Sequence, residues 1–329
     1  MVQSPPAQQR PVRLIAVGGT IAMRGERAVP ALDAAGLLEA LPGLAATHAL
    51  EAETLLSVPG PQLSLDQALQ VARRAVAAAD SGEGVVVTTG TDTMEEVAVL
   101  CAMLYGGEPP IVFTGANRPA SSPGADGPAN LLDAVALAAS PAASDLGVVV
   151  AFGGEIHAAM TVRKVDSTGP SAFGSPGAGP IGRIVERRVW LHSRPLRPAP
   201  LPVERLGHRV EIVTAVLGDD GELLGAATAR GDGAVLVAFG AGHVTPPLLA
   251  RLREAARRVP VLVTCRPERS SMLFDTYGFD GAESDVRASG AVCVPFLSPQ
   301  AARVALLCCL GAGLDRDGTA TVLAPWDAG

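Results

Sequence analysis

Short apolar runs alternate along the chain with longer segments in which apolar residues recur every three or four positions. The runs richest in β-branched residues are Val12–Val17, Gly84–Thr88, Pro110–Thr114 and Gly147–Phe152. Runs that are apolar at nearly every position are typical of strands covered on both faces, as in a mainly parallel sheet. We therefore expect these four strands to lie in one sheet with helices on both sides.

Helices are predicted in the segments between these strands. Two of them begin with the Ser/Thr-x-x-Glu/Gln spacing of a capping box, at Ser64 and at Thr93. In a capping box the first side chain binds a free backbone N–H group of the first helical turn. The predicted helices cover Leu65–Ala79, the segment from Thr93 to about Leu104, and Gly127–Ala139.

A proline-rich segment divides the chain. Four prolines fall within Arg194–Pro202, and because proline lacks an N–H group and fixes φ, no regular element is expected there. The alternation then resumes, with strands near Arg209–Leu217, Ala234–Ala238, Val259–Thr264 and Ala291–Val294 and helices near Pro247–Arg258 and Pro299–Gly311. The sequence thus predicts an α/β protein: a larger N-terminal domain with a doubly wound, mainly parallel sheet (1–193), a linker (194–208) and a smaller C-terminal α/β domain (209–329).

Composition and charge exclude several classes of partner. The 329 residues carry a formal net charge of −7, which argues against a nucleic-acid partner and against an anionic membrane surface. No run of 18 residues is free of Gly, Pro and charge, and the N-terminal residues lack the apolar region of a signal peptide. The five cysteines lack metal-ligand spacing and are expected to be buried thiols of a reducing compartment. We therefore expect a cytoplasmic protein.

One basic residue differs from all the others. Lys164 is the only lysine among the 26 lysines and arginines. The excess of arginine is the composition expected of a GC-rich genome, but that bias does not explain the exception. A lysine can lose its proton in a dry site, whereas an arginine effectively cannot. The single lysine therefore points to a chemical role for Lys164.

In open α/β sheets, ligands bind beyond the carboxyl ends of the strands. Thr20 follows the first predicted strand, Thr91 and Asp92 follow the second, and Lys164 comes after the fourth. Each has a structural alternative, since a Gly-Gly-Thr sequence also forms tight turns and Thr and Asp also cap helices. Together they supply a hydroxyl nucleophile, a carboxylate and a base, and the glycines before Thr20 and Thr91 allow close backbone approach.

Other catalytic patterns fit poorly. The chain has no G-x-S-x-G elbow and no Walker A motif, and the turn Gly18–Met23 is not the G-x-G-x-x-G of a dinucleotide site. The five histidines are scattered without metal-ligand spacing. We therefore expect neither a dinucleotide site nor a metal site.

Several segments together carry a resemblance to a known family. They are V-G-G-T-I-A at Val17–Ala22, T-T-G-T-D-T-M-E-E at Thr88–Glu96, the block Thr114–Leu131, R-K at Arg163-Lys164, Y-G-F at Tyr277–Phe279 and L-S-P-Q-A-A-R at Leu297–Arg303. In this order they resemble the bacterial-type L-asparaginase (asparaginase/glutaminase) family, and the similarity spans nearly the whole chain.

The resemblance implies an amidohydrolase that converts L-asparagine to L-aspartate and ammonia without a cofactor. Thr20 would be the nucleophile that forms a β-aspartyl ester. Lys164 would be the proton-shuttling base, Thr91 would position the carbonyl or the attacking water, and Asp92 would also hold the substrate's α-ammonium group. The resemblance further implies a homodimer or homotetramer whose active sites lie between the N-terminal domain of one subunit and the C-terminal domain of its neighbour.

The segment after the first motif departs from the family pattern. Family members usually carry a lid there with a tyrosine that hydrogen-bonds the nucleophile, whereas Met23–Pro30 is short and contains no tyrosine. The only tyrosines are Tyr105, near a predicted helix end, and Tyr277. Either the nucleophile is activated without a phenol, or another group replaces it, such as Tyr277 from a neighbouring subunit.

The loop that binds the substrate's α-carboxylate also departs from the pattern. The family's Ser-Gln pair aligns with Gly60 and Pro61, and proline has no N–H to donate. Gln62, Ser57 or backbone N–H groups would then take over. The other substrate-binding positions that the resemblance implies are Ala116, His243 at an interface asparagine position, and Glu283 as an acidic residue of the partner subunit.

Alternatives to an asparaginase remain. One is a catalytically impaired homologue kept as a metabolite-binding or structural protein, against which the complete set of Thr20, Thr91, Asp92 and Lys164 argues. Another is the asparaginase-like subunit of a transfer-RNA-dependent amidotransferase, which usually carries an extra N-terminal domain that Met1–Arg13 is too short to provide. Asparagine and glutamine differ by one methylene, which a pocket discriminates by only about 1–3 kcal/mol.

Overall fold

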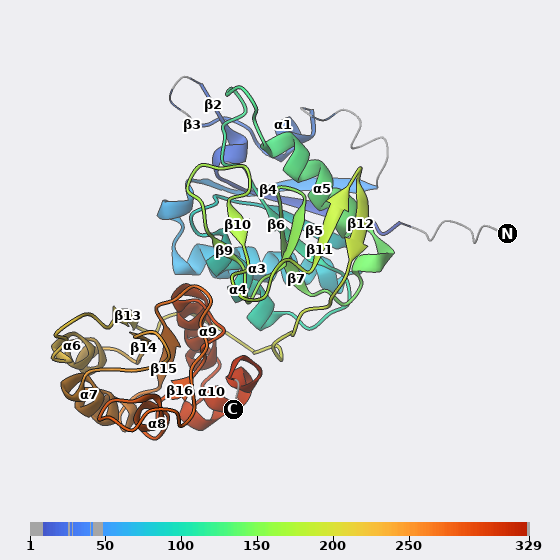
Figure 1. The fold of residues 1–329 in the computed structure, drawn as a ribbon. Helices are drawn as coiled ribbons and strands as arrows, with labels where there is room; N and C mark the ends of the chain where they lie inside the picture. The colour runs from blue at the N-terminus through green and yellow to red at the C-terminus, as the bar shows by residue number, and fades with distance from the viewer. Residues whose placement is uncertain (1–8, 26, 28, 40, 42–48, 328–329) are drawn as a thin grey trace. The chain divides into compact units, whose positions relative to one another are not determined.

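The structure is a computed structural model that describes residues 9–25, 27, 29–39, 41 and 49–327. The chain forms two compact units (Figure 1). Unit 1 extends to Ser175 and includes Gly179–Arg197, whereas unit 2 comprises Pro176–Ala178 and the chain from Pro198 onward. The change of unit after Arg197 falls inside the segment 194–208, and the domain bounds on either side of that segment stay a prediction.

Unit 1 contains a mixed sheet. Among the described residues it has eight strands in the order β12-β11-β8-β7-β6-β5-β1-β4. Their bounds are β1 Val12–Gly18, β4 Leu50–Val58, β5 Gly84–Thr88, β6 Ile111–Thr114, β7 Val148–Phe152, β8 Glu155–Ala158, β11 Gly182–Val185 and β12 Arg188–Leu191. The strands β4, β1, β5, β6 and β7 are parallel, and β8, β11 and β12 extend the sheet in antiparallel fashion. The four predicted strands are present within one residue at each end.

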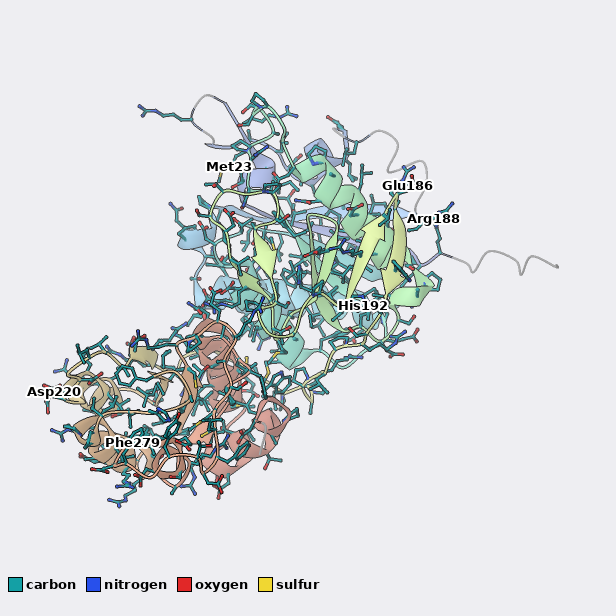
Figure 2. All side chains as sticks on the ribbon, viewed as in Figure 1. Met23, Glu186, Arg188, His192, Asp220 and Phe279 are labelled. Atoms are coloured by element: carbon teal, nitrogen blue, oxygen red, sulfur yellow. The ribbon has the colours of Figure 1, made fainter. Side chains whose placement is uncertain are left out.

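The strands that the sequence pattern missed lie toward the sheet's edges. β4 pairs only with β1, and its residues are half-buried or exposed with none fully buried, so it lacks a continuous apolar run. In the β11–β12 hairpin, β11 alternates buried and exposed residues and β12 alternates exposed and half-buried ones. The hairpin turns at Glu186, labelled in Figure 2, and Arg187, which both have positive φ. Such half-exposed strands are hard to distinguish from loops in a single sequence.

Helices cover both faces of this sheet (Figure 1). They are α1 (Ala34–Glu39), α3 (Leu65–Asp80), α4 (Met94–Leu104) and α5 (Gly127–Ala139). The apolar sides of α1 and α5 share one core with the strands, while α3 and α4 pack together on the other face.

One of the two predicted capping boxes forms. Ser64 and Gln67 bind each other's backbone N–H groups at the start of α3. α4 also begins as predicted, with Thr93 at its N-cap position, but the predicted capping bond of the Thr93 side chain is wrong, because its hydroxyl donates instead to the carbonyl oxygen of Gly60 at 3.3 Å. The hydroxyl therefore ties two loops together.

Short elements connect the strand ends of unit 1. They are η1 (Thr20–Ala22), β2 (Met23–Arg24), β3 (Val29–Pro30), η2 (Gly60–Gln62), η3 (Pro141–Ala143), β9 (Arg163–Lys164) and β10 (Phe173–Gly174). β2 pairs with β3 and β9 pairs with β10, each as a small antiparallel ribbon outside the main sheet. The labelled Met23 marks the point where the chain leaves η1 (Figure 2).

Unit 2 contains a parallel sheet in the order β13-β14-β15-β16. Its elements are β13 Val210–Thr214, α6 Glu222–Arg230, β14 Gly233–Ala238, α7 Pro246–Ala256, β15 Val261–Cys265, α8 Glu283–Arg287, β16 Val292–Cys293, α9 Pro299–Gly311, α10 Arg316–Leu323 and η4 Ala324–Trp326. α6, α7 and α8 share one apolar core with the strands, and α9 packs against the sheet with α10 beside it. The fold class predicted from the sequence is confirmed.

The thiols and indoles of the chain have distinct environments. All five cysteines are free and buried, as predicted, and burial raises the pKa of Cys265 to about 11. Trp190 on β12 is 74% exposed, whereas Trp326 of unit 2 is only 2% exposed. Within the described ranges, no helix combines the length and the apolar character needed to cross a membrane.

Candidate active site

Three glycines bring the ends of neighbouring strands into backbone contact. Gly19 follows β1, Gly60 follows β4 and Gly90 follows β5. A Cβ atom added at Gly19 would lie 2.4 Å from the Gly90 nitrogen, and one added at Gly90 would lie 2.8 Å from the Gly60 Cα. No side chain fits at Gly19 or Gly90, so the three loops pack backbone to backbone at the carboxyl edge of the sheet.

Thr20 is held beside this contact by the residues that follow it. Ile21 and Ala22 are buried in the core that α1 and α5 share. Gly19 has φ +83° and ψ 179°, a conformation essentially reserved for glycine. The Thr20 side chain is half-buried, and in the described part of the chain its hydroxyl makes no hydrogen bond. That oxygen is therefore available to a ligand.

Thr91, Asp92 and Lys164 are in direct contact. Lys164 Nζ donates to Thr91 Oγ1 at 2.9 Å and to Asp92 Oδ1 at 2.8 Å. Thr91 is buried, the Lys164 side chain is 20% exposed and the Asp92 side chain is 57% exposed. Three of the four predicted catalytic residues thus form one cluster, and the Gly19–Gly90 contact brings the loop that carries Thr20 beside the loop that carries Thr91.

Lys164 reaches the cluster by a longer route than the sequence pattern indicated. β8 returns antiparallel to β7, and a turn then leads to β9, where Lys164 pairs with Phe173 of β10. The backbone N–H of Lys164 donates to the carboxylate of Glu95 in the first turn of α4. Sequence analysis did not single out Glu95, because two acids in a first helical turn are also what a helix N-terminus favours.

The predicted substrate-binding residues of unit 1 lie around this cluster, and they differ in which of their groups could reach a ligand. The Gly60 carbonyl oxygen accepts from the Thr93 hydroxyl at 3.3 Å. The Gln62 N–H is bound to the Pro59 oxygen at 3.0 Å, but the Gln62 side chain is exposed. The Ala116 methyl group is buried in the core, which leaves its backbone as the part that could face a ligand.

Tyr105 does not replace the missing lid tyrosine. Its hydroxyl donates to the carbonyl oxygen of Pro109 at 2.6 Å, and the residue is buried at the end of α4. Burial raises the pKa of this phenol. Its one donor is therefore already used in a structural contact.

His243 and Glu283 meet within unit 2. His243 Nε2 lies 3.0 Å from Glu283 Oε2, and the backbone N–H groups of Thr276 and Tyr277 donate to Glu283 Oε1 at 2.6 and 2.9 Å. Burial alone would raise the pKa of Glu283, but these hydrogen bonds outweigh it and lower the pKa. Phe279, labelled in Figure 2, has its ring edge-on to that of His243, with centroids 5.1 Å apart. Because Glu283 is fully buried, the geometry favours His243 as the member of the pair that meets a ligand.

Comparison with known proteins supports the resemblance seen in the sequence. Residues 11–197 match the family described as "Asparaginase, N-terminal", and residues 209–323 match "Glutaminase/Asparaginase C-terminal domain". A "Probable L-asparaginase" of Deinococcus radiodurans is 37% identical over 321 residues, covering 95% of this chain and 96% of its own. A "Probable L-asparaginase periplasmic" of Haemophilus influenzae is 34% identical over 308 residues, covering 90% of this chain and 87% of its own.

A solved structure extends the likeness to three dimensions. The "Crystal Structure of Probable Cytoplasmic L-asparaginase from Campylobacter jejuni" has a TM-score of 0.84 and 29% sequence identity, with 96% of this chain and 99% of that one covered. Since both domain descriptions match and the similarity extends over nearly the entire length, the chain belongs to the asparaginase family.

Proposed function

We propose that the protein hydrolyses the side-chain amide of L-asparagine and releases L-aspartate and ammonia. The observation that carries the proposal is the contact of the only lysine with Thr91 and Asp92, at the sheet edge where the Thr20 loop also lies. The similar proteins of D. radiodurans and C. jejuni bear the names "Probable L-asparaginase" and "Probable Cytoplasmic L-asparaginase", which supports the same substrate.

The proposed first step forms an ester. The Thr20 oxygen attacks the side-chain carbonyl carbon, and its proton passes to the neutral amine of Lys164. The C–N bond then breaks, and the proton on Lys164 is transferred to the departing nitrogen, which leaves as ammonia. Backbone N–H groups of the glycine-rich strand ends are suited to bind the oxyanion that develops on the carbonyl oxygen.

The proposed second step returns the enzyme to its starting state. A water oxygen attacks the ester carbon, one water proton passes by way of Lys164 to the Thr20 oxygen, and L-aspartate leaves. Thr91, 2.9 Å from the Lys164 amine, positions either the substrate carbonyl or this water. A lysine suits both steps because it can accept and return a proton, which an arginine cannot.

Asp92 and the loop after β4 are proposed to bind the amino-acid end of the substrate. Asp92 has its carboxylate largely exposed beside the Lys164 amine, so it can pair with the α-ammonium group. Gly60 would supply a backbone group to the α-carboxylate, and Gln62 would supply its side-chain amide. Ala116 would contact the substrate through its backbone. Because Gly60 carries no hydroxyl, we expect weaker binding than a full Ser-Gln clamp gives, and a micromolar Michaelis constant for asparagine would contradict this.

We also propose that the protein is a cytoplasmic homodimer or homotetramer. In this arrangement unit 2 of a neighbouring subunit supplies His243 and Glu283 to the active site. The contact of the partly exposed His243 with the buried Glu283 and the exposed aromatic rings of Tyr277 and Phe279 beside it support a binding role for this surface. The mass in solution tests the assembly, since a stable and fully active monomer would contradict a shared site.

An ammonia-release assay with asparagine, glutamine and their D-isomers tests the function. Thr20→Ala should abolish release without loss of the fold, whereas Thr321→Ala on α10 removes an equivalent hydroxyl elsewhere and should change nothing. Lys164→Arg keeps the charge and should be nearly as inactive as Lys164→Ala. Turnover by Thr20→Ala would exclude the nucleophile, and activity restored by arginine would exclude Lys164 as the base.

A second candidate function is binding of the amino acid without hydrolysis. It is favoured by one observation, the Thr20 hydroxyl that has no hydrogen-bond partner to activate it within the described residues. Titration calorimetry distinguishes the two functions. Saturable asparagine binding by the unmodified protein with no ammonia release would favour the binding protein over the enzyme.

A further inference from the structure

We propose that Glu95 is a positioning residue for Lys164. The Glu95 carboxylate binds the backbone N–H of Lys164 and thereby fixes the β9–β10 ribbon, from which the lysine amine reaches Thr91 and Asp92. The proposal rests on the function proposed above for Lys164. Glu95 is not one of the four predicted catalytic residues, but it would hold one of them, Lys164, in place.

The ribbon that carries Lys164 needs an anchor. β9 and β10 are two residues each and belong to a separate small sheet, and an isolated two-stranded ribbon is marginally stable in water. The ribbon's own bonds are few, among them Val165 N–H to the Ala172 oxygen at 2.7 Å. On one side Phe173 packs on Phe152 of β7, with ring centroids 5.0 Å apart.

Glu95 supplies an anchor from helix α4. Its Oε2 accepts the Lys164 backbone N–H. Thr91 and Asp92, the two residues that bind the lysine amine, lie immediately before the same helix. The start of α4 therefore fixes these two residues and, through Glu95, the lysine backbone as well. A shift of the ribbon would change the Nζ to Oγ1 distance directly, and small misplacements of reacting groups have large effects on rate.

The two acids that hold Lys164 differ in exposure. Asp92 binds the amine and is largely exposed, whereas Glu95 is half-buried. Burial raises the pKa of Glu95, and the bond from Lys164 N–H and the charge of Arg163 counteract this in part. The charged groups that face it are Arg163 and Lys164 from β9 and Glu96 from its own helix. Glu95 therefore acts on the lysine and not on the substrate.

Two substitutions separate positioning from charge. Glu95→Ala removes the acceptor, and we expect kcat to fall at least about tenfold with little change in the Michaelis constant. Glu95→Gln keeps an acceptor oxygen and should retain at least about a third of the kcat. Because it also removes the titratable carboxyl of Glu95, the pH profile of kcat for Glu95→Gln should differ from that of the wild-type protein.

A control distinguishes this role from a purely structural one. Asp133 of α5 is also a partly buried helical carboxyl, and burial alone raises its pKa. Asp133→Ala should alter stability without changing kcat or the pH profile. If folded Glu95→Ala keeps the wild-type kcat, or if Glu95→Gln is as inactive as Glu95→Ala, the positioning role is overturned.

The single lysine gives a readout that does not depend on activity. With ¹⁵N-lysine, the full chain has one labelled backbone amide, that of Lys164. Its proton resonance should titrate with the Glu95 carboxyl, and this titration should vanish in both Glu95 variants and persist in Asp133→Ala. An amide shift unaffected by Glu95→Ala overturns the proposal. If the wild-type protein hydrolyses no amide, the proposed function fails, while this resonance still decides the placement of Lys164.

Discussion

The contact between Gly19 and Gly90 can be tested by adding a single methyl group. In Gly19→Ala the new Cβ would lie 2.4 Å from Gly90 N, 2.5 Å from Gly90 Cα and 2.7 Å from the Thr89 carbonyl carbon. Ordinary contact at such a position begins at 3.4 Å, so the loops must separate by about 1 Å. The backbone at φ +83° and ψ 179° adds strain of its own.

The expected cost follows from these two effects. A residue forced into this glycine conformation costs about 1–3 kcal/mol, and overpacking adds about 1–3 kcal/mol. The sum, about 2–6 kcal/mol, is a large part of the 5–15 kcal/mol that is typical of folded domains, yet most of that range leaves the protein folded. Separation of the Thr20 loop from the Thr91 loop by about 1 Å should lower kcat/KM about 100-fold.

Gly82→Ala is the matched control. Gly82 also has positive φ, +95°, but nothing lies within 4 Å of its Cβ position. It should show the backbone cost, about 1–2 kcal/mol, with unchanged ammonia release. Calorimetric unfolding and the ammonia assay measure the two quantities. If Gly19→Ala retains kcat/KM within threefold, or if Gly82→Ala loses as much activity, the close contact does not place the nucleophile.

Three further outcomes are expected. Gly60→Ser should lower the Michaelis constant for asparagine, because its Cβ would meet its nearest neighbours at 3.4 Å, an ordinary contact, and would add a hydroxyl; an unchanged constant in the ammonia assay argues against this loop as the carboxylate site. Burial lowers the pKa of His157, so the unfolded chain binds more protons and the unfolding free energy falls as the pH drops below about 6.5. His157→Gln should flatten that dependence of the melting temperature between pH 5 and 7.5, and an identical slope would contradict it. Tyr105→Phe loses a 2.6 Å bond to Pro109 and should lower stability by about 1–2 kcal/mol at constant kcat, whereas a fall in kcat would make the phenol part of the chemistry.

The sequence predicted the buried part of the fold because burial leaves a pattern. β1 and β5 are covered on both faces and read as continuous apolar runs, and the residues just beyond them, Thr20 and Thr91, were found by that route. β4 lies at an edge with mixed exposure, so no such pattern marks it. The residues of an edge strand do not reveal which distant strand it pairs with, and so the sequence pattern misses it.

The candidate site shows the same division between local and distant contacts. Lys164 stood out by composition alone, but its contacts with Thr91 and Asp92 span more than 70 positions. Thr93 had the spacing of a helix cap, yet its hydroxyl binds the loop after β4. Glu95 lies within the motif Thr88–Glu96, but nothing in the sequence marks its role, since its bond is to a backbone group of residue 164.

The placement of the two indoles has a practical consequence for spectroscopy. Trp190 lies on an edge strand in contact with water, and Trp326 is enclosed in the C-terminal unit. Denaturation transfers only Trp326 from an apolar to an aqueous environment, so the red shift of the emission will trace the melting of that unit alone. A curve recorded by fluorescence will therefore leave the nucleophile-bearing unit unobserved, and circular dichroism must accompany it before any variant is called stable.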